Sequence, residues 1–152
     1  MTSLYFDEFF VGEKFETAAE TVSEADIVAF AKVFDPQPFH VDRAAAERTH
    51  FHGLIASGFH TLSLSCALFF RMRLLEEANL GSPGMEDVRW VRPLRPGDTI
   101  HVVAEVTAQR ASQSKPDRGV VWMRHDTINQ RGELVMSVNC MHMLKRRGAE
   151  PP

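Results

Sequence analysis

The chain has 152 residues, of which 44% are hydrophobic and 24% are charged, values that exclude a disordered or fibrous protein. This length is typical of one domain, so we expect a single domain over residues 1–152, with residues 145–152 as a flexible tail. The net charge is −3, from 17 basic and 20 acidic residues, and this balance argues against a nucleic-acid partner. Two cysteines are too few for a disulfide framework, which indicates a cytoplasmic protein.

The N-terminal sequence MTSLYFDEFF has neither a basic start nor an apolar run, and so does not resemble a signal peptide. The longest stretch without Asp, Glu, Lys or Arg is 49–70. It contains three histidines and three serines, which makes it too polar to face lipid. We therefore expect no membrane partner and interpret this stretch as part of a helix buried inside the protein.

The first elements have clear local signals. Residues 14–21 predict a strand. Ser23 has the properties of an N-cap, with Asp26 three residues later, and apolar residues follow at helical spacing. This helix must end by Asp35, because Pro36 disfavours helical geometry in the residue before it.

The next segment, 35–40, contains two prolines and is expected to be a stiff, non-helical loop. Asp42 then predicts the cap of a short helix through Glu47. The strongest helical pattern follows, from about Leu54 to Leu80, apolar on more than one side and therefore expected to be largely buried.

The second half of the sequence predicts strands joined by tight turns, over residues 85–91, 99–111, 120–128 and 134–144. Such strands form an antiparallel meander. Since one long apolar helix precedes them, the expected fold is α+β, with the antiparallel sheet wrapped around one long central helix.

Two segments could carry chemistry. Asp35 and His40 are five residues apart across Pro36 and Pro38, and acid–base catalysis needs two such groups held close together. The alternative is that Asp35 caps a turn and His40 lies on the surface. Gly53 lies at the predicted start of the long helix, where free N–H groups could stabilise an oxyanion. Its alternative role is that of a turn residue.

These segments together resemble the MaoC-like dehydratases, the (R)-specific enoyl-CoA hydratases of the hotdog fold. That family has an Asp-x-Asn-Pro-x-His loop followed by Gly-x-x-x-Ala-Ser, and this chain has 35-DPQPFH-40 and 53-GLIAS-57. The segment 91-VRPLRPGD-98 resembles the family's turn into its long strands, and the resemblance extends over about residues 9–144. The chain departs from the signature at Gln37, where the family has Asn, and this difference bears on the substrate class.

The resemblance implies a hydro-lyase that adds water reversibly across the C2=C3 bond of a 2-enoyl-CoA thioester. Asp35 and His40 would be catalytic, the Gly53 N–H would bind the thioester oxygen, and Ser57 would hydrogen-bond Asp35. No metal or cofactor is implied beyond coenzyme A as part of the substrate. The alternatives are a non-catalytic acyl-CoA-binding hotdog protein and a hotdog acyl-CoA thioesterase. Neither acyl length nor direction follows from the sequence.

Other polar residues allow further interpretations. Arg89, Arg92 and Arg95 could meet the phosphates of coenzyme A or be solvated at a strand end. A metal site built from His40, His50, His52 and His60 is disfavoured, because no carboxylate is in register with them. The remaining histidines, His101, His125 and His142, are interpreted as hydrogen-bonded sheet residues. Since a single such sheet leaves edges and one face uncovered, we expect a homodimer or a higher homo-oligomer.

Overall fold

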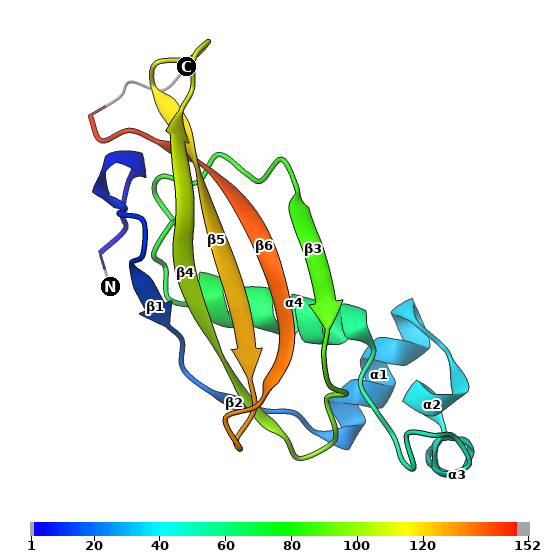
Figure 1. The fold of residues 1–152 in the computed structure, drawn as a ribbon. Coiled ribbons are helices and arrows are strands. Elements are labelled where there is room, and N and C mark those ends of the chain that lie inside the picture. The colour runs from blue at the N-terminus through cyan, green and yellow to red at the C-terminus, as the bar shows by residue number, and fades with distance from the viewer. Residues whose placement is uncertain (1, 149–152) are drawn as a thin grey trace.

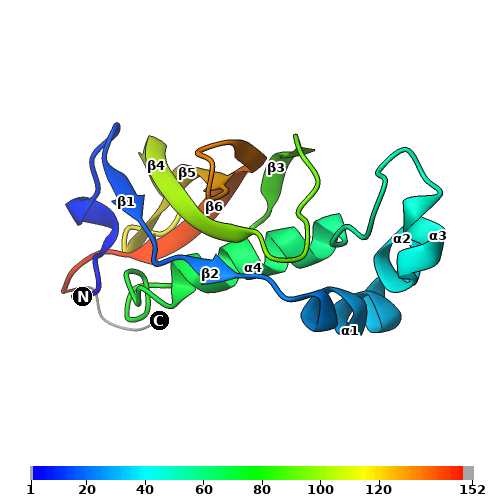
Figure 2. The same cartoon turned by 90° about the horizontal axis from the view of Figure 1, so that it is seen from below.

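The computed structural model describes residues 2–148 and shows one antiparallel sheet curled over a central helix (Figures 1 and 2). The main strands are β3 (Met85–Trp90), β4 (Thr99–Ala111), β5 (Arg118–Ile128) and β6 (Leu134–Lys145). The strand order is β1-β4-β5-β6-β3, so β3 lies at one edge. This arrangement confirms the predicted α+β class, and within residues 2–148 no helix is long and apolar enough to cross a membrane.

The predicted first strand is divided into two short strands, β1 (Lys14–Glu16) and β2 (Glu20–Thr21), which both pair with β4. The interruption lies at Thr17. Its side chain accepts a hydrogen bond from the Val102 N–H and donates one to the Ala18 carbonyl. The Thr17 hydroxyl thus accepts from β4 the hydrogen bond that a backbone carbonyl would accept in a regular strand. The chain bends at this point.

Helix α1 (Glu24–Phe34) begins and ends where the sequence predicts. The Ser23 hydroxyl accepts a hydrogen bond from the Asp26 N–H, and Asp35 is the C-cap. Two short helices follow, α2 (Pro38–Val41) and α3 (Arg43–Glu47), and the Asp42 carboxylate caps the second of these. The expectation that residues 35–40 contain no helix is wrong for Pro38–His40, because proline is well tolerated at the first position of a helix.

The central helix α4 (Gly58–Phe70) is shorter than the predicted helix from Leu54 to Leu80. Its start is set by Ser57, whose hydroxyl accepts a hydrogen bond from the Phe59 N–H. Its end is followed by Arg73 in the left-handed conformation, at φ 60°. Residues 71–78 form turns instead, and these turns bury three of the apolar side chains that produced the helical pattern, Leu74, Leu75 and Ala78.

The core lies between α4 and the concave face of the sheet. Inward residues alternate along β4, β5 and β6, and Val102, Val106 and Met123 are fully buried there. The buried face of α4 includes polar groups, and the hydroxyl of Ser65 hydrogen-bonds that of Thr127 on β5 at 2.7 Å. This hydrogen bond fixes the helix against the sheet without burying an unpaired hydroxyl.

Residues 145–148 of the predicted tail lie against the rest of the fold. Lys145 belongs to β6, and the Arg146 N–H donates to the Asp117 carbonyl at 2.8 Å. The guanidinium of Arg147 forms two hydrogen bonds with the Glu8 carboxylate, a geometry that fixes both groups. The rest of that predicted tail, 149–152, lies outside the described residues.

The N-cap of α1 offers a test of how this part of the fold is stabilised. Ser23→Ala removes the acceptor for the Asp26 N–H, so we expect the free energy of unfolding to fall by about 1 kcal/mol. Urea denaturation measures this change. Ser114→Ala, in an exposed loop, is the matched control and should leave the midpoint unchanged. Equal midpoints for both variants would show that the cap does not stabilise α1.

Candidate active site

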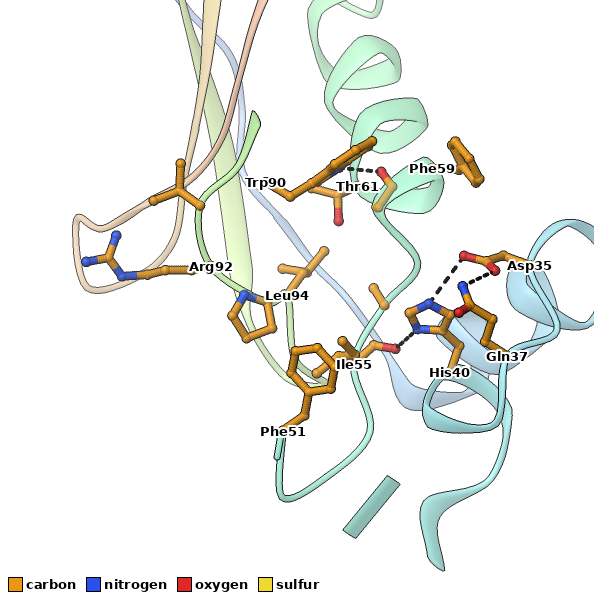
Figure 3. Close-up of a pocket in the computed structure, with 14 residues that line it drawn as sticks. Asp35, Gln37, His40, Phe51, Ile55, Phe59, Thr61, Trp90, Arg92 and Leu94 are labelled. Carbon is orange, nitrogen blue, oxygen red and sulfur yellow. Dashed lines mark hydrogen bonds and ion pairs between the residues drawn. The ribbon is translucent and has the colours of Figure 1, made fainter. Parts of the chain in front are cut away.

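A pocket of about 460 Å³ opens where the start of α4 meets α2 and the segment that follows β3 (Figure 3). Most of its wall is apolar or aromatic, while the side chains of Asp35, Gln37 and His40 converge on one side of it. A mainly apolar pocket with a few convergent polar groups is the usual form of a small-molecule site. The apolar and aromatic part of the wall comprises Phe51, Ile55, Ala56, Phe59, Trp90, Val91, Pro93 and Leu94.

The Asp35 carboxylate is the centre of the polar side. Its Oδ1 accepts a hydrogen bond from Gln37 Nε2 at 2.6 Å, and its Oδ2 accepts one from Ser57 Oγ at 2.7 Å. The same Oδ2 lies 3.2 Å from His40 Nε2. Three neighbours from different segments therefore hold this carboxylate in one position.

These contacts determine the charge state of Asp35. Burial acts to raise the pKa of this carboxyl, but the hydrogen bonds from Gln37 and Ser57, together with His40, lower it by more. The net pKa lies below the usual value for an aspartate. The group is consequently an ionised carboxylate at neutral pH, able to accept a proton.

His40 is buried and fixed at both ring nitrogens. Its Nδ1 donates to the Ile55 carbonyl at 2.7 Å, since a carbonyl oxygen can only accept. This hydrogen bond places a proton on Nδ1 and leaves Nε2 directed at Asp35. The sequence places His40 here because Pro38 begins α2, whose single turn brings the imidazole back toward the end of α1.

The structure brings together three of the four residues predicted from the sequence, Asp35, His40 and Ser57. The prediction that Gly53 lies at the start of the central helix is wrong. Gly53 precedes the helix by five residues, lies beside the Arg95 guanidinium, and lines a different surface hollow. Its φ of 156° is one that residues with a side chain rarely adopt, so its role is conformational.

Gly58 occupies the place that was predicted for Gly53. It is the first residue of α4 and lines the pocket, and within residues 2–148 its N–H has no hydrogen-bond partner. A Cβ at this position would lie 2.5 Å from the Trp90 ring, and the indole Nε1 donates to the Gly58 carbonyl at 2.9 Å. The N-cap preference of Ser57 was the sequence signal that could have identified this helix start.

The three candidate arginines lie in different places. Arg92 lines the pocket, with its Nε 3.3 Å from the Glu133 carboxylate. Arg95 donates to the Phe51 carbonyl and so holds the loop before α4. Arg89 is exposed and pairs with Asp87 on its own strand. Only Arg92 is therefore positioned at the pocket itself.

The remaining histidines do not join His40. His50 and His52 are exposed, and His60 stacks on Phe30 at a centroid distance of 4.7 Å. Among residues 2–148, the three-residue group that could hold a metal ion lies elsewhere, in the core of the sheet.

The chain matches a protein-family model described as the MaoC like domain, over residues 8–127. It is 31% identical over 140 residues to the uncharacterized protein YdeM of Bacillus subtilis, which covers 92% of this chain and 98% of YdeM.

Solved structures with the same fold include proteins described as a dehydratase and as an R-hydratase. A MaoC-like dehydratase from Rhodospirillum rubrum superposes with a TM-score of 0.90 at 39% identity, covering 97% of this chain and all of that one. The R-hydratase PhaJ1 of Pseudomonas aeruginosa superposes with a TM-score of 0.74 at 28% identity, covering 99% and 94%. A Mycobacterium tuberculosis protein described as a double hotdog fold, at 21% identity and a TM-score of 0.81, covers 99% of this chain and 47% of that one. These likenesses confirm the hotdog fold.

The hydrogen bond from Gln37 gives a test of the charge state of Asp35. Gln37→Ala removes one donor to the ionised carboxylate, so the pKa of Asp35 should rise. The pH titration of its carboxyl carbon by ¹³C NMR measures this shift. Gln113→Ala, in an exposed loop, should leave the titration unchanged, whereas an unchanged or lower pKa in Gln37→Ala would contradict the argument.

Proposed function

Because the chain belongs to the MaoC-like domain family, we propose that it is a hydro-lyase that adds water reversibly across the C2=C3 double bond of a 2-enoyl-CoA thioester. The observation that carries the proposal is the contact between Asp35 and His40 beside the free N–H of Gly58. Hydration needs a group that moves the proton of water and a donor for the thioester oxygen, and one pocket contains both. The likeness to an R-hydratase supports the same reaction class.

The polar pair would hold and deprotonate the attacking water. Asp35 Oδ2 and His40 Nε2 are 3.2 Å apart, so one water can contact both of them. As the water oxygen bonds to C3, the pair takes one proton from it, and a proton passes to C2 to complete the addition. Ser57 and Gln37 act as positioning residues, because each donates a hydrogen bond to the carboxylate and holds its lone pairs toward the pocket.

The thioester oxygen becomes more negative while the carbanion at C2 forms. The Gly58 N–H, at the positive end of the α4 dipole, is the donor that would stabilise this charge. Glycine is needed here because Trp90 packs directly against its Cα. The apolar wall would take the acyl chain, and Arg92 would face the coenzyme A portion of the substrate, with no separate cofactor needed for the addition.

The assay follows the absorbance of the enoyl thioester in crotonyl-CoA and a panel of longer and branched enoyl-CoAs. We expect the absorbance to be lost without release of free thiol. Release of thiol would identify a thioesterase instead. Binding of acyl-CoA without loss of absorbance on any member of the panel would identify a non-catalytic acyl-CoA-binding protein.

Substitution of the pair tests the mechanism directly. Asp35→Asn keeps the shape and hydrogen bonding of the side chain but removes its basicity, so the hydration rate should fall by about 10²–10⁴-fold. His40→Ala should have a similar effect, and Ser57→Ala a smaller one, because Ser57 only positions Asp35. Asp26→Asn, on the exposed side of α1, is the matched control. Full activity in Asp35→Asn, with the fold verified by circular dichroism, would refute the mechanism.

A homodimer is part of the proposal, because β3 is an edge strand with exposed apolar side chains at Met85 and Trp90. Sedimentation should give about twice the chain mass of 17.2 kDa at micromolar protein. Met85→Lys places a charge on this edge and should shift the equilibrium toward the monomer. Val11→Lys, also at an exposed apolar position but away from β3, should not. A monomeric wild-type protein would rule out the dimer.

A further inference from the structure

A second group of polar side chains lies in the core, and none of its members lines the pocket described above. It consists of His125 on β5 and of Cys140 and His142 on β6, all buried beneath α4. One metal-binding atom from each residue lies within 4.8 Å of the other two. Hydration as proposed above requires none of these three side chains.

The sheet itself brings the three residues together. His125 pairs with Val138, so that Cys140 and His142 follow on the same face of the neighbouring strand. The two imidazoles lean toward one another along the concave face, with their Nε2 atoms 3.4 Å apart. Phe69 of α4 covers both rings, at centroid distances of 4.6 Å from His125 and 5.5 Å from His142.

The two buried histidines of this group have few hydrogen-bond partners. Across residues 2–148, the one polar contact of each imidazole is the Nε2 atom of the other, at a distance longer than that of a normal N–H hydrogen bond. A neutral imidazole has one ring nitrogen with a free lone pair, so each ring can supply one ligand atom.

We propose that His125, Cys140 and His142 bind one Zn²⁺ ion, through the two Nε2 atoms and Sγ. Zinc takes imidazole nitrogen at about 2.0–2.1 Å and thiolate sulfur at about 2.3 Å in tetrahedral geometry. Two nitrogens 3.4 Å apart subtend an angle of about 110° at such an ion, which is close to tetrahedral. The Cys140 Sγ lies within 4.8 Å of a ring nitrogen of each histidine and would have to move inward by about 1.2 Å at most to reach the roughly 3.6 Å between N and S ligands of a tetrahedral zinc ion.

Binding is a coordination step without oxidation. Each imidazole supplies one lone pair, and the Cys140 thiol transfers its proton to solvent as the sulfur–zinc bond forms. Burial raises the pKa of this thiol to about 12, so without the ion it is protonated, and the charge of the metal is what favours the thiolate. The bound ion would join β5 to β6 beneath α4 and so stabilise the fold, away from the pocket where water is added.

Equilibrium dialysis of the whole chain against Zn²⁺, followed by metal analysis, tests the proposal without any activity assay. We expect one Zn²⁺ per chain, one proton released per ion, and a higher Tm in the presence of Zn²⁺ than with a chelator. Co²⁺ in place of Zn²⁺ should give a thiolate-to-cobalt charge-transfer band. If the wild-type chain binds neither ion with this stoichiometry, the proposal is overturned, and the histidines are a neutral hydrogen-bonded pair.

Conservative variants locate the site. Cys140→Ser should abolish the cobalt–thiolate band, and His142→Gln should weaken Zn²⁺ binding by more than about 100-fold, the upper end of the loss caused by removing an outer-shell partner. Cys66→Ser, which removes the other thiol of the chain, should keep both the band and the affinity. Loss of binding in Cys66→Ser, or its retention in Cys140→Ser, would overturn the assignment.

Enoyl-CoA hydration by the folded Cys140→Ser variant should remain at the wild-type level, because Cys140 lies outside the pocket. Failure of zinc binding and failure of hydration are thus observed in separate experiments.

Discussion

The site depends on how the carboxylate of Asp35 is held. An ionised carboxylate that is partly withdrawn from water needs hydrogen-bond donors, and here they are Gln37, just before α2, and Ser57, at the start of α4, while His40 of α2 contacts the same carboxylate through Nε2. Satisfying this one group therefore requires the ends of three helices to meet. The hydrogen bonds from these donors offset the cost of withdrawing the carboxylate from water. They also lower the pKa of the carboxyl and so keep it ionised.

Two backbone hydrogen bonds place Asp35, His40 and Ser57 at the edge of an apolar pocket. The extended segment before α4 donates from Ile55 to the Phe39 carbonyl and from Ala56 to the Leu94 carbonyl. This segment thereby joins α2 to the loop after β3 and places Gly58, the first residue of α4, in the wall of the pocket. Backbone groups in an apolar setting are normally paired, whereas the Gly58 N–H has no partner among residues 2–148.

The chain contains two sets of polar groups with opposite environments. The Asp35 set lies at a pocket that solvent enters, and its charge is stabilised by donors. The set of His125, Cys140 and His142 is sealed between the sheet and α4, where burial keeps each group neutral. The first set is therefore open to solvent, whereas the second would be completed by the Zn²⁺ ion proposed above.

The sequence alone determined those helices and strands whose ends are set by residues close to them along the chain. The Ser23 cap and Pro36 fixed α1, the alternation of 99–111 fixed β4, and the segments 35–40 and 53–57 together indicated the family and the candidate pair of Asp35 and His40. Only the tertiary structure decided where the central helix ends, because its apolar pattern continues into turns whose side chains, Leu74, Leu75 and Ala78, are also buried in the core. It also decided that residue 58 must lack a side chain, since the Trp90 ring reaches this position from a distant strand. The meeting of two histidines and a cysteine depends on strand register and on the curvature of the sheet, which no spacing along the chain specifies.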